Sequence, residues 1–189
     1  MRDDGLMNDW GRAKYGDPCR ECGFSWGMSL QEAIVLVTDL PDSYAGTLRG
    51  ANGSERHPDL AWSVCAYVCH VADNLGIGAE RLMGVVRGAP SRIPAYDENL
   101  LAEARRYEEV ALEAALWSLE RSVGDWREAV KQADRKQVTL LHPERGELTV
   151  ADAALFSTHD AFHHHWDIQR SLDWTLRTSK TRHSGQQPE

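Results

Sequence analysis

The sequence predicts an all-α fold, an up-and-down bundle of four helices. Apolar residues recur at helical spacing in four segments, and Ser, Thr, Gly or Pro stands where most of these segments begin or end. The links between the segments are short to moderate, as in bundles of neighbouring helices. With 189 residues, 42% of them hydrophobic, the chain can bury the core of one domain without stabilising disulfides or metal ions.

The first helical segment begins at residue 29 and contains a proline. In SLQEAIVLVTDLPDSYAGTLRG, Ser29 is in position to cap a helix, and Glu32 follows three residues later, as in a capping box. Pro41 has no backbone N–H to donate within a helix. We therefore expect the helix to kink or split at Pro41.

The second segment has the clearest helical pattern of the chain. It reads HPDLAWSVCAYVCHVADNLGIGAERLMGVV from His57, and Pro58 stands near its expected start. Its apolar residues recur at helical spacing: Leu60, Val64, Val68, Val71, Leu75 and Leu82. The next stretch, GAPSRIPAYDE, contains two prolines and a glycine, so we predict a loop there.

The third segment is rich in residues with high helix propensity. From Asn99 to about Val123 it reads NLLAEARRYEEVALEAALWSLERSV, and we expect Gly124 to close it. The following stretch, QVTLLHPERGELTV, has β-branched residues on both sides of PERG. This pattern fits either a short hairpin or a loop.

The last segment, VADAALFSTHDAFHHHWDIQRSLDWTL, is predicted to be a helix capped by Thr149. The tail after it, RTSKTRHSGQQPE, is polar and is expected to fray. We therefore divide the chain into an N-terminal extension with a CxxC motif (residues 1–28), the four-helix bundle (29–175) and a flexible tail (176–189).

Charge and hydropathy argue against some classes of partner. Lys plus Arg number 21 and Asp plus Glu number 29, so the formal charge of −8 disfavours binding to the phosphate backbone of nucleic acid. No run approaches the roughly 18 apolar residues of a membrane span, and the N-terminus lacks the apolar stretch of a signal peptide. We expect a cytoplasmic protein with no nucleic-acid or membrane partner. The sequence leaves the oligomeric state open, and a homodimer is one expectation.

The last segment contains a dense group of metal-binding side chains. Five imidazole or carboxylate groups fall between residues 159 and 165, in HDAFHHH. Asp160 with His164, and His159 with His163, each have the i, i+4 spacing that places two side chains on one face of a helix. Either pair is suited to hold one metal ion, but two ligands make a weak site.

A third ligand must come from another long helix, and His70 is the candidate. The remaining histidines outside the dense group lie before a helix, beside a proline or in the tail: His57, His142 and His183. His70 lies at the border of the apolar face of its segment. On the last segment, His164 borders the apolar face and Asp160 lies just beyond it, whereas the other pair points further round. We therefore favour His70, Asp160 and His164 as ligands and keep His159 with His163 as the alternative.

The four cysteines pose a separate question. Cys19 and Cys22 form CxxCG, which occurs in zinc sites and in redox motifs, while Cys65 and Cys69 stand one turn apart in the second segment. Four thiolates would suit a structural zinc site that ties the N-terminal extension to the bundle. Buried reduced thiols together with an oxidisable CxxC are the alternative.

Two motifs resemble those of the DinB-like family. WSVCAYVCHVAD, from Trp62, is similar to the second-helix motif, in which a histidine follows an apolar turn with a tyrosine. HDAFHHHWDI is similar to the last-helix motif, in which an aliphatic residue stands four residues after a histidine ligand, as Ile168 follows His164 here. Asp160 takes the place of the other last-helix ligand, which is usually His and is Glu in the mycothiol-dependent maleylpyruvate isomerases, so Asp is a departure. The resemblance covers residues 29–175, and CRECGF is similar to sequences that precede this domain in actinobacterial members.

The resemblance implies a four-helix bundle that holds a divalent metal, commonly zinc, through three protein ligands. It also implies a transferase or isomerase that uses a low-molecular-weight thiol, such as mycothiol or bacillithiol, against an electrophilic small molecule. Three protein ligands with an open position are the pattern of a catalytic zinc, and a thiol bound there is deprotonated at neutral pH. A metal-dependent hydrolase, and a non-catalytic protein that binds metal or a small ligand, are the alternatives.

Overall fold

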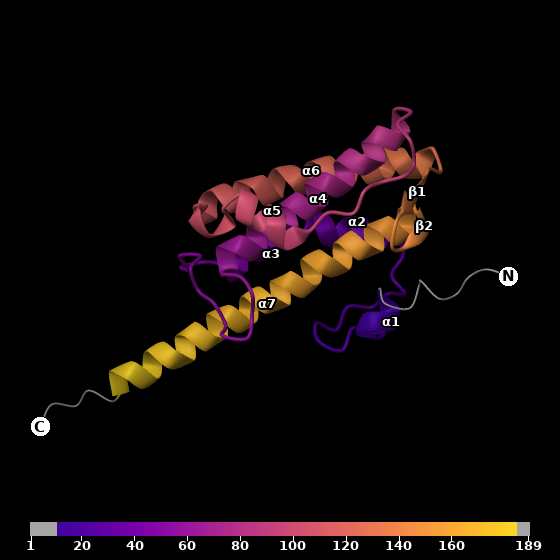
Figure 1. The fold of residues 1–189 in the computed structure, drawn as a ribbon. Helices are drawn as coiled ribbons and strands as arrows, with labels where there is room; N and C mark the ends of the chain where they lie inside the picture. The colour runs from indigo at the N-terminus through magenta and orange to yellow at the C-terminus, as the bar shows by residue number, and fades with distance from the viewer. Residues whose placement is uncertain (1–10, 185–189) are drawn as a thin grey trace, which may run out of the picture.

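The computed structural model describes residues 11–184 and confirms an all-α bundle of four helices (Figure 1). The long helices are α4 (Val64–Val86), α6 (Leu112–Arg135) and α7 (Val150–Ser184). The fourth helix of the bundle is divided into two shorter helices, α2 (Leu30–Thr38) and α3 (Leu40–Thr47). The smaller elements are α1 (Arg12–Tyr15), α5 (Glu98–Ala104), the 3-10 turn η1 (Tyr107–Glu109), β1 (Thr139–His142) and β2 (Gly146–Thr149). None of the helices in residues 11–184 combines the length and the apolar composition that a membrane span requires.

The directions of the helices depart from simple up-and-down alternation, because α4 and α6 run parallel. Near the start of both helices, Cys65 Sγ lies 3.2 Å from the carbonyl oxygen of Val110. At their other ends, the Lys136 ammonium donates to the carbonyl of Val86 at 2.9 Å. The connection over residues 87–111 therefore crosses back along the bundle, and Figure 1 shows it returning beside α4 to α5. The α2–α3 pair and α7 run in the other direction (Figure 1).

The first helix forms and splits as predicted. Ser29 Oγ accepts the Glu32 N–H at 3.3 Å, and the Glu32 carboxylate accepts the Ser29 N–H at 2.8 Å, so the capping box is complete. Pro41 lies in the first turn of α3, where a missing N–H costs no helical hydrogen bond. The split brings the fully buried Tyr44 against α7, where its hydroxyl donates to the carbonyl of Ala161 at 2.7 Å.

The second helix begins at Val64, later than the predicted start at His57. Its N-cap is Ser63, whose hydroxyl accepts a first-turn N–H at 3.3 Å. The N–H of Cys65 donates to the carbonyl of Gly53 at 2.8 Å. The Ser63 cap and the preceding loop thus accept hydrogen bonds from N–H groups in the first turn of α4. The apolar residues before Ser63 belong to that loop.

The prediction of one continuous helix over residues 99–123 is wrong, because the chain breaks between α5 and α6. Arg106 adopts a left-handed backbone conformation there, with φ of 53°. The break turns the buried Tyr107 toward α4, where its hydroxyl donates to Asp73.

Helix α6 does not end at Gly124, where the sequence predicts a stop. α6 continues to Arg135, because its apolar stripe continues through Trp126 and Val130, which are both buried. A glycine inside a helix weakens it by only about 1 kcal/mol relative to alanine. Burial of this stripe therefore outweighs the stop signal.

After α6 the chain forms the hairpin and not the loop. β1 and β2 pair antiparallel with Leu140 opposite Leu148, and both leucines are buried. Thr149 then caps α7 as predicted, since its hydroxyl accepts the N–H of Asp152 at 3.1 Å. Residues 176–184 are helical where the sequence predicts a flexible tail, and residues 185–189 lie outside the described residues.

The described part of the N-terminal extension, residues 11–28, packs beside α7 (Figure 1). Its buried residues form a separate small cluster, and side chains of α7 pack against it: Cys19, Phe24 and Trp26 with Leu155, Phe156 and Phe162. The extension is thus attached to the helix that carries the histidine-rich motif.

Candidate metal site

The three predicted ligands come together from two helices. His70 projects from α4, Asp160 and His164 project from α7, and one ligand atom of each lies within 4.8 Å of the others. His70 Nε2 is 3.4 Å from Asp160 Oδ2, and His164 Nε2 is 3.6 Å from Asp160 Oδ1. A tetrahedral zinc ion with bonds of about 2.0–2.1 Å would hold such atoms about 3.4 Å apart. The spacing and the donor types therefore fit a zinc ion, and metal binding by these residues stays a prediction.

Hydrogen bonds behind this cluster orient two of its members. Asn74 Nδ2 donates to Asp160 Oδ2 at 2.6 Å. His164 Nδ1 lies 3.0 Å from Asp167 Oδ2, a partner that favours the proton on Nδ1 and leaves the Nε2 lone pair facing the cluster. The Tyr67 ring stacks on His164 with centroids 4.9 Å apart. Metal-binding histidines in proteins are commonly held by a carboxylate in this way.

The charges of the cluster are coupled. Burial would raise the pKa of Asp160, but the charges of His70 and His164, with hydrogen bonds from His70 and Asn74, hold it well below its usual range. Burial would likewise lower the pKa of His70, and the Asp160 carboxylate more than offsets this, so the net shift is upward. Asp160 is therefore ionised at neutral pH, as a metal ligand must be.

A cavity of about 330 Å³ opens beside the cluster. All three predicted ligands line it, together with residues of the N-terminal extension, the loop before α5 and the hairpin. Its wall also carries three cationic side chains and several apolar or aromatic ones: Lys14, Arg81 and Arg145, with Trp26, Leu82, Tyr96 and Phe156. Small-molecule sites in proteins have volumes of roughly 300–1,000 Å³. The cavity is thus large enough for a small substrate.

Sequence reasoning missed the walls of this cavity. Arg81 donates to the carbonyl of Pro94 and lies over the Tyr96 ring, 5.4 Å from its centroid. His142, which stands beside a proline, also lines the cavity, and its Nδ1 accepts the N–H of Arg145 at 3.3 Å. Tyr96 lies in a loop and Arg145 in a hairpin turn, where no helical periodicity indicates which side faces a site, whereas Arg81 lies on α4 and His142 ends β1.

The alternative pair, His159 and His163, belongs to a different group. Its ring nitrogens lie with the thiols of Cys19 and Cys22, and one ligand atom from each of these four residues lies within 4.8 Å of the others. The two i, i+4 pairs of α7 therefore face different partners, and His70 meets only the favoured pair.

The four cysteines do not meet in one place. Cys65 and Cys69 lie in the main core, whereas Cys19 and Cys22 lie in the extension. Among the described residues, neither Cys65 nor Cys69 belongs to a group of three or more close metal-binding side chains. The four-cysteine zinc site that the sequence left open is therefore replaced by two separate thiol pairs.

Comparisons with known proteins agree with this architecture. Residues 29–168 match the DinB superfamily. Among solved structures, the fold is similar to one described as "YfiT from Bacillus subtilis is a probable metal-dependent hydrolase with an unusual four-helix bundle topology". That similarity has a TM-score of 0.64 and 18% sequence identity over 80% of this chain and 90% of that chain, so it concerns the fold alone. No curated protein matches this chain.

Proposed function

The chain belongs to the DinB superfamily, and from this premise we propose that it is a metal-dependent enzyme. In this proposal it transfers or isomerises an electrophilic small molecule with the help of a low-molecular-weight thiol such as mycothiol. His70, Asp160 and His164 hold a divalent ion, and zinc suits these donors best. The observation that carries the proposal is the convergence of these side chains from α4 and α7 at the wall of one cavity.

The composition of the group favours catalysis over a purely structural role. Three protein ligands are typical of catalytic zinc sites, whereas structural zinc sites use four. When bound, zinc lowers the pKa of a thiol or a water molecule and so supplies a nucleophile at neutral pH. The chain itself supplies orientation: Asp167 holds the His164 ring through Nδ1, and Asn74 holds Asp160. A side chain acting as nucleophile is not required.

Two arginines of the cavity wall suit a reactant that carries an anionic group. Arg81 and Arg145 line the same cavity as the three ligands. Burial lowers the pKa of both guanidinium groups, but arginine stays protonated in proteins at neutral pH. A guanidinium group binds a carboxylate or phosphate through paired hydrogen bonds. We therefore include a carboxylate or phosphate on the electrophile or on the thiol in the proposal.

Turnover with defined thiols tests the proposal. Protein that has been stripped of metal and reloaded with zinc is assayed on a panel of electrophiles with mycothiol, bacillithiol, glutathione or no thiol. We expect turnover that needs both zinc and a thiol and that is lost in His70→Ala. His165→Ala is the matched control, because His165 lies on the same helix but stacks on Tyr44, outside both ligand groups. Zinc content measured on the same samples separates loss of the ion from loss of activity.

A metal-dependent hydrolase is the second candidate. The YfiT structure, which shares the fold, is named a probable metal-dependent hydrolase. The same three ligands would serve a water nucleophile in place of a thiol. Zinc-dependent turnover in the arm without thiol would replace the transferase by a hydrolase. Turnover in none of the arms would favour a non-catalytic protein that binds metal or a small ligand.

A further inference from the structure

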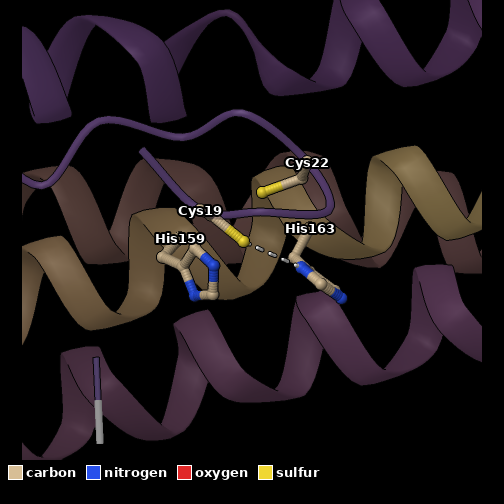
Figure 2. Close-up of side chains that lie close together, drawn as sticks. All are labelled: Cys19, Cys22, His159 and His163. Atoms are coloured by element: carbon tan, nitrogen blue, oxygen red, sulfur yellow. Dashed lines mark hydrogen bonds between the residues drawn. The ribbon is translucent and has the colours of Figure 1, made fainter. Parts of the chain in front are cut away.

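A second group of four metal-binding side chains lies between the N-terminal extension and α7. Figure 2 shows Cys19 and Cys22 on the extension beside His159 and His163, which stand one turn apart on α7. One ligand atom of each residue lies within 4.8 Å of the others. We propose that these four side chains bind a structural zinc ion, separate from the site of His70.

The spacing and the donor types fit zinc. Bonds of about 2.3 Å to sulfur and about 2.0–2.1 Å to nitrogen place a sulfur and a nitrogen about 3.6 Å apart in a tetrahedral site. Cys19 Sγ lies 3.9 Å from His163 Nδ1, close to that value, and both cysteines are free thiols. Two cysteines and two histidines are a common set of structural zinc ligands, and four protein ligands leave no position for a substrate.

The backbone of the extension holds the two thiols on a tight turn. The N–H of Cys19 donates to the carbonyl of Phe24 at 2.8 Å, and the N–H of Gly23 donates to the carbonyl of Cys19 at 2.9 Å. Gly23 has a φ of 77°, which a glycine adopts without steric strain. The glycine after the CxxC pair thus closes the turn that carries Cys19 and Cys22 to α7.

Burial and hydrogen bonding at the histidines also favour an ion. His159 is 5% exposed, and its Nε2 has no hydrogen-bond partner among the described residues. A hydrogen bond at that nitrogen therefore does not explain why a polar ring is buried here. His163 presents Nδ1 to Cys19, while its Nε2 lies 3.4 Å from Glu21 Oε2. A carboxylate on the second ring nitrogen is the usual arrangement for a metal-bound histidine.

The ion would fasten a segment that has only a small core of its own. The buried apolar cluster of the extension consists of Cys19, Phe24 and Trp26, and the match to the DinB superfamily begins after it, at residue 29. Tyr15 and Trp26 line the cavity beside His70. A zinc ion between the extension and α7 would therefore hold one wall of that cavity in place, because binding to a folded site stabilises the fold around it.

A disulfide is the rival role for the same cysteines. CxxC pairs also act in thiol–disulfide exchange, and that role needs no histidine pair one turn apart. In this chain two histidines of α7 complete a group of four donors with the thiols. The histidines therefore favour zinc over redox chemistry.

Cobalt substitution of the full-length protein separates the two sites. The protein is stripped with a chelator under reducing conditions and titrated with Co²⁺, and we expect it to bind two equivalents. One of them should give a thiolate-to-cobalt charge-transfer band in the near ultraviolet, because thiolates are among its ligands. The double variant Cys19→Ser/Cys22→Ser should lose this band and one equivalent, whereas His70→Ala should lose one equivalent and keep the band. Cys69→Ser is the matched control and should keep both, because its thiol belongs to neither group.

Three results would overturn the proposal. Wild-type protein that binds cobalt without a thiolate band would exclude the cysteines as ligands, and this readout does not depend on the folding of any variant. A band that survives both His159→Ala and His163→Ala would mean that the thiols bind without the histidines. A band that disappears in His70→Ala would mean that the two groups are not separate. Since none of these readouts uses activity, they stand whether or not the His70 site is catalytic.

Discussion

His163 and His164 are consecutive on α7, yet their rings are nearly perpendicular, with an interplanar angle of 88° and centroids 5.9 Å apart. His163 faces Cys19 in the extension, whereas His164 faces Asp160 in the bundle. Consecutive side chains differ by about 100° around a helix axis, so two interleaved i, i+4 pairs face two different neighbours. Asp167 lies between them: its Oδ2 is 3.0 Å from His164 Nδ1 and 4.0 Å from His163 Nε2.

Removal of His70 should abolish zinc binding at the three-residue site. His70→Ala leaves two ligands on one helix, which is too few for a tight site. Asp160→Ala and His164→Ala should behave in the same way, and His165→Ala should bind as wild type does. Competition with a chromophoric chelator measures the affinity. Unchanged affinity in His70→Ala would show that the ligand set is wrong.

Asp167→Asn should weaken zinc binding at the His164 site without abolishing it. The substitution keeps the shape of the side chain but removes the charge that favours the proton on Nδ1 of His164. Loss of such a supporting carboxylate lowers metal affinity by about 10- to 100-fold. The same chelator competition measures the effect, and Asp173→Asn, an exposed change on the same helix, is the control. Equal affinities in the two variants would refute a positioning role for Asp167.

Neutralisation of the cavity arginines should impair the use of anionic reactants. Arg81→Gln and Arg145→Gln each remove a guanidinium group from the cavity wall. A hydrogen bond to a charged group contributes about 1.5–3 kcal/mol, so KM for a carboxylate-bearing reactant should rise about 10- to 100-fold. An uncharged analogue should be used equally well by both variants and the wild type. Arg121→Gln, an exposed change on α6, serves as the control, and a similar rise in KM there would contradict a specific role.

The capping box at the start of α2 should make stability depend on pH. Hydrogen bonds from the Ser29 side chain and backbone lower the pKa of Glu32. A carboxylate whose pKa is lower in the folded state stabilises the protein above its unfolded-state pKa, and this contribution is lost as the pH falls through the folded-state pKa. Ser29→Ala should therefore move the pKa of Glu32 toward its ordinary value and destabilise the protein more at neutral than at acidic pH. NMR titration of Glu32 in both proteins checks this, and coincident titration curves would count against it.

Two glycine substitutions should change stability in opposite directions. Gly53 has a φ of 92°, and a Cβ there would lie 3.0 Å from Cys65 Cβ. Gly53→Ala should therefore destabilise the protein by about 1–3 kcal/mol. Gly46 is exposed in α3, and a Cβ there meets no atom within 4 Å, so Gly46→Ala should stabilise the protein by about 0.5–1 kcal/mol. Denaturant unfolding of the two variants measures both effects, and a shift of the same sign in both would be inconsistent with this account.

The sequence by itself determined most of the helices, and it predicts three metal ligands whose side chains the fold brings together. Apolar periodicity reports which face of a helix is buried, so it predicts that His70, Asp160 and His164 lie near the borders of buried faces. Capping residues marked the helix starts at Ser29 and Thr149 because a cap acts within a single turn. The predicted helix end at Gly124 is wrong, because burial of more distant residues outweighs a local stop signal.

Only the tertiary structure decided what the second histidine pair faces. Cys19 and His163 are 144 positions apart in the chain, and no local pattern links a turn in the extension to one face of a distant helix. The parallel course of α4 and α6 was decided in the same way, by the path of the crossover over residues 87–111. Periodicity is set by neighbours within a few residues, whereas these contacts depend on how whole segments pack, and that packing brings the extension, the loop and the hairpin around one cavity.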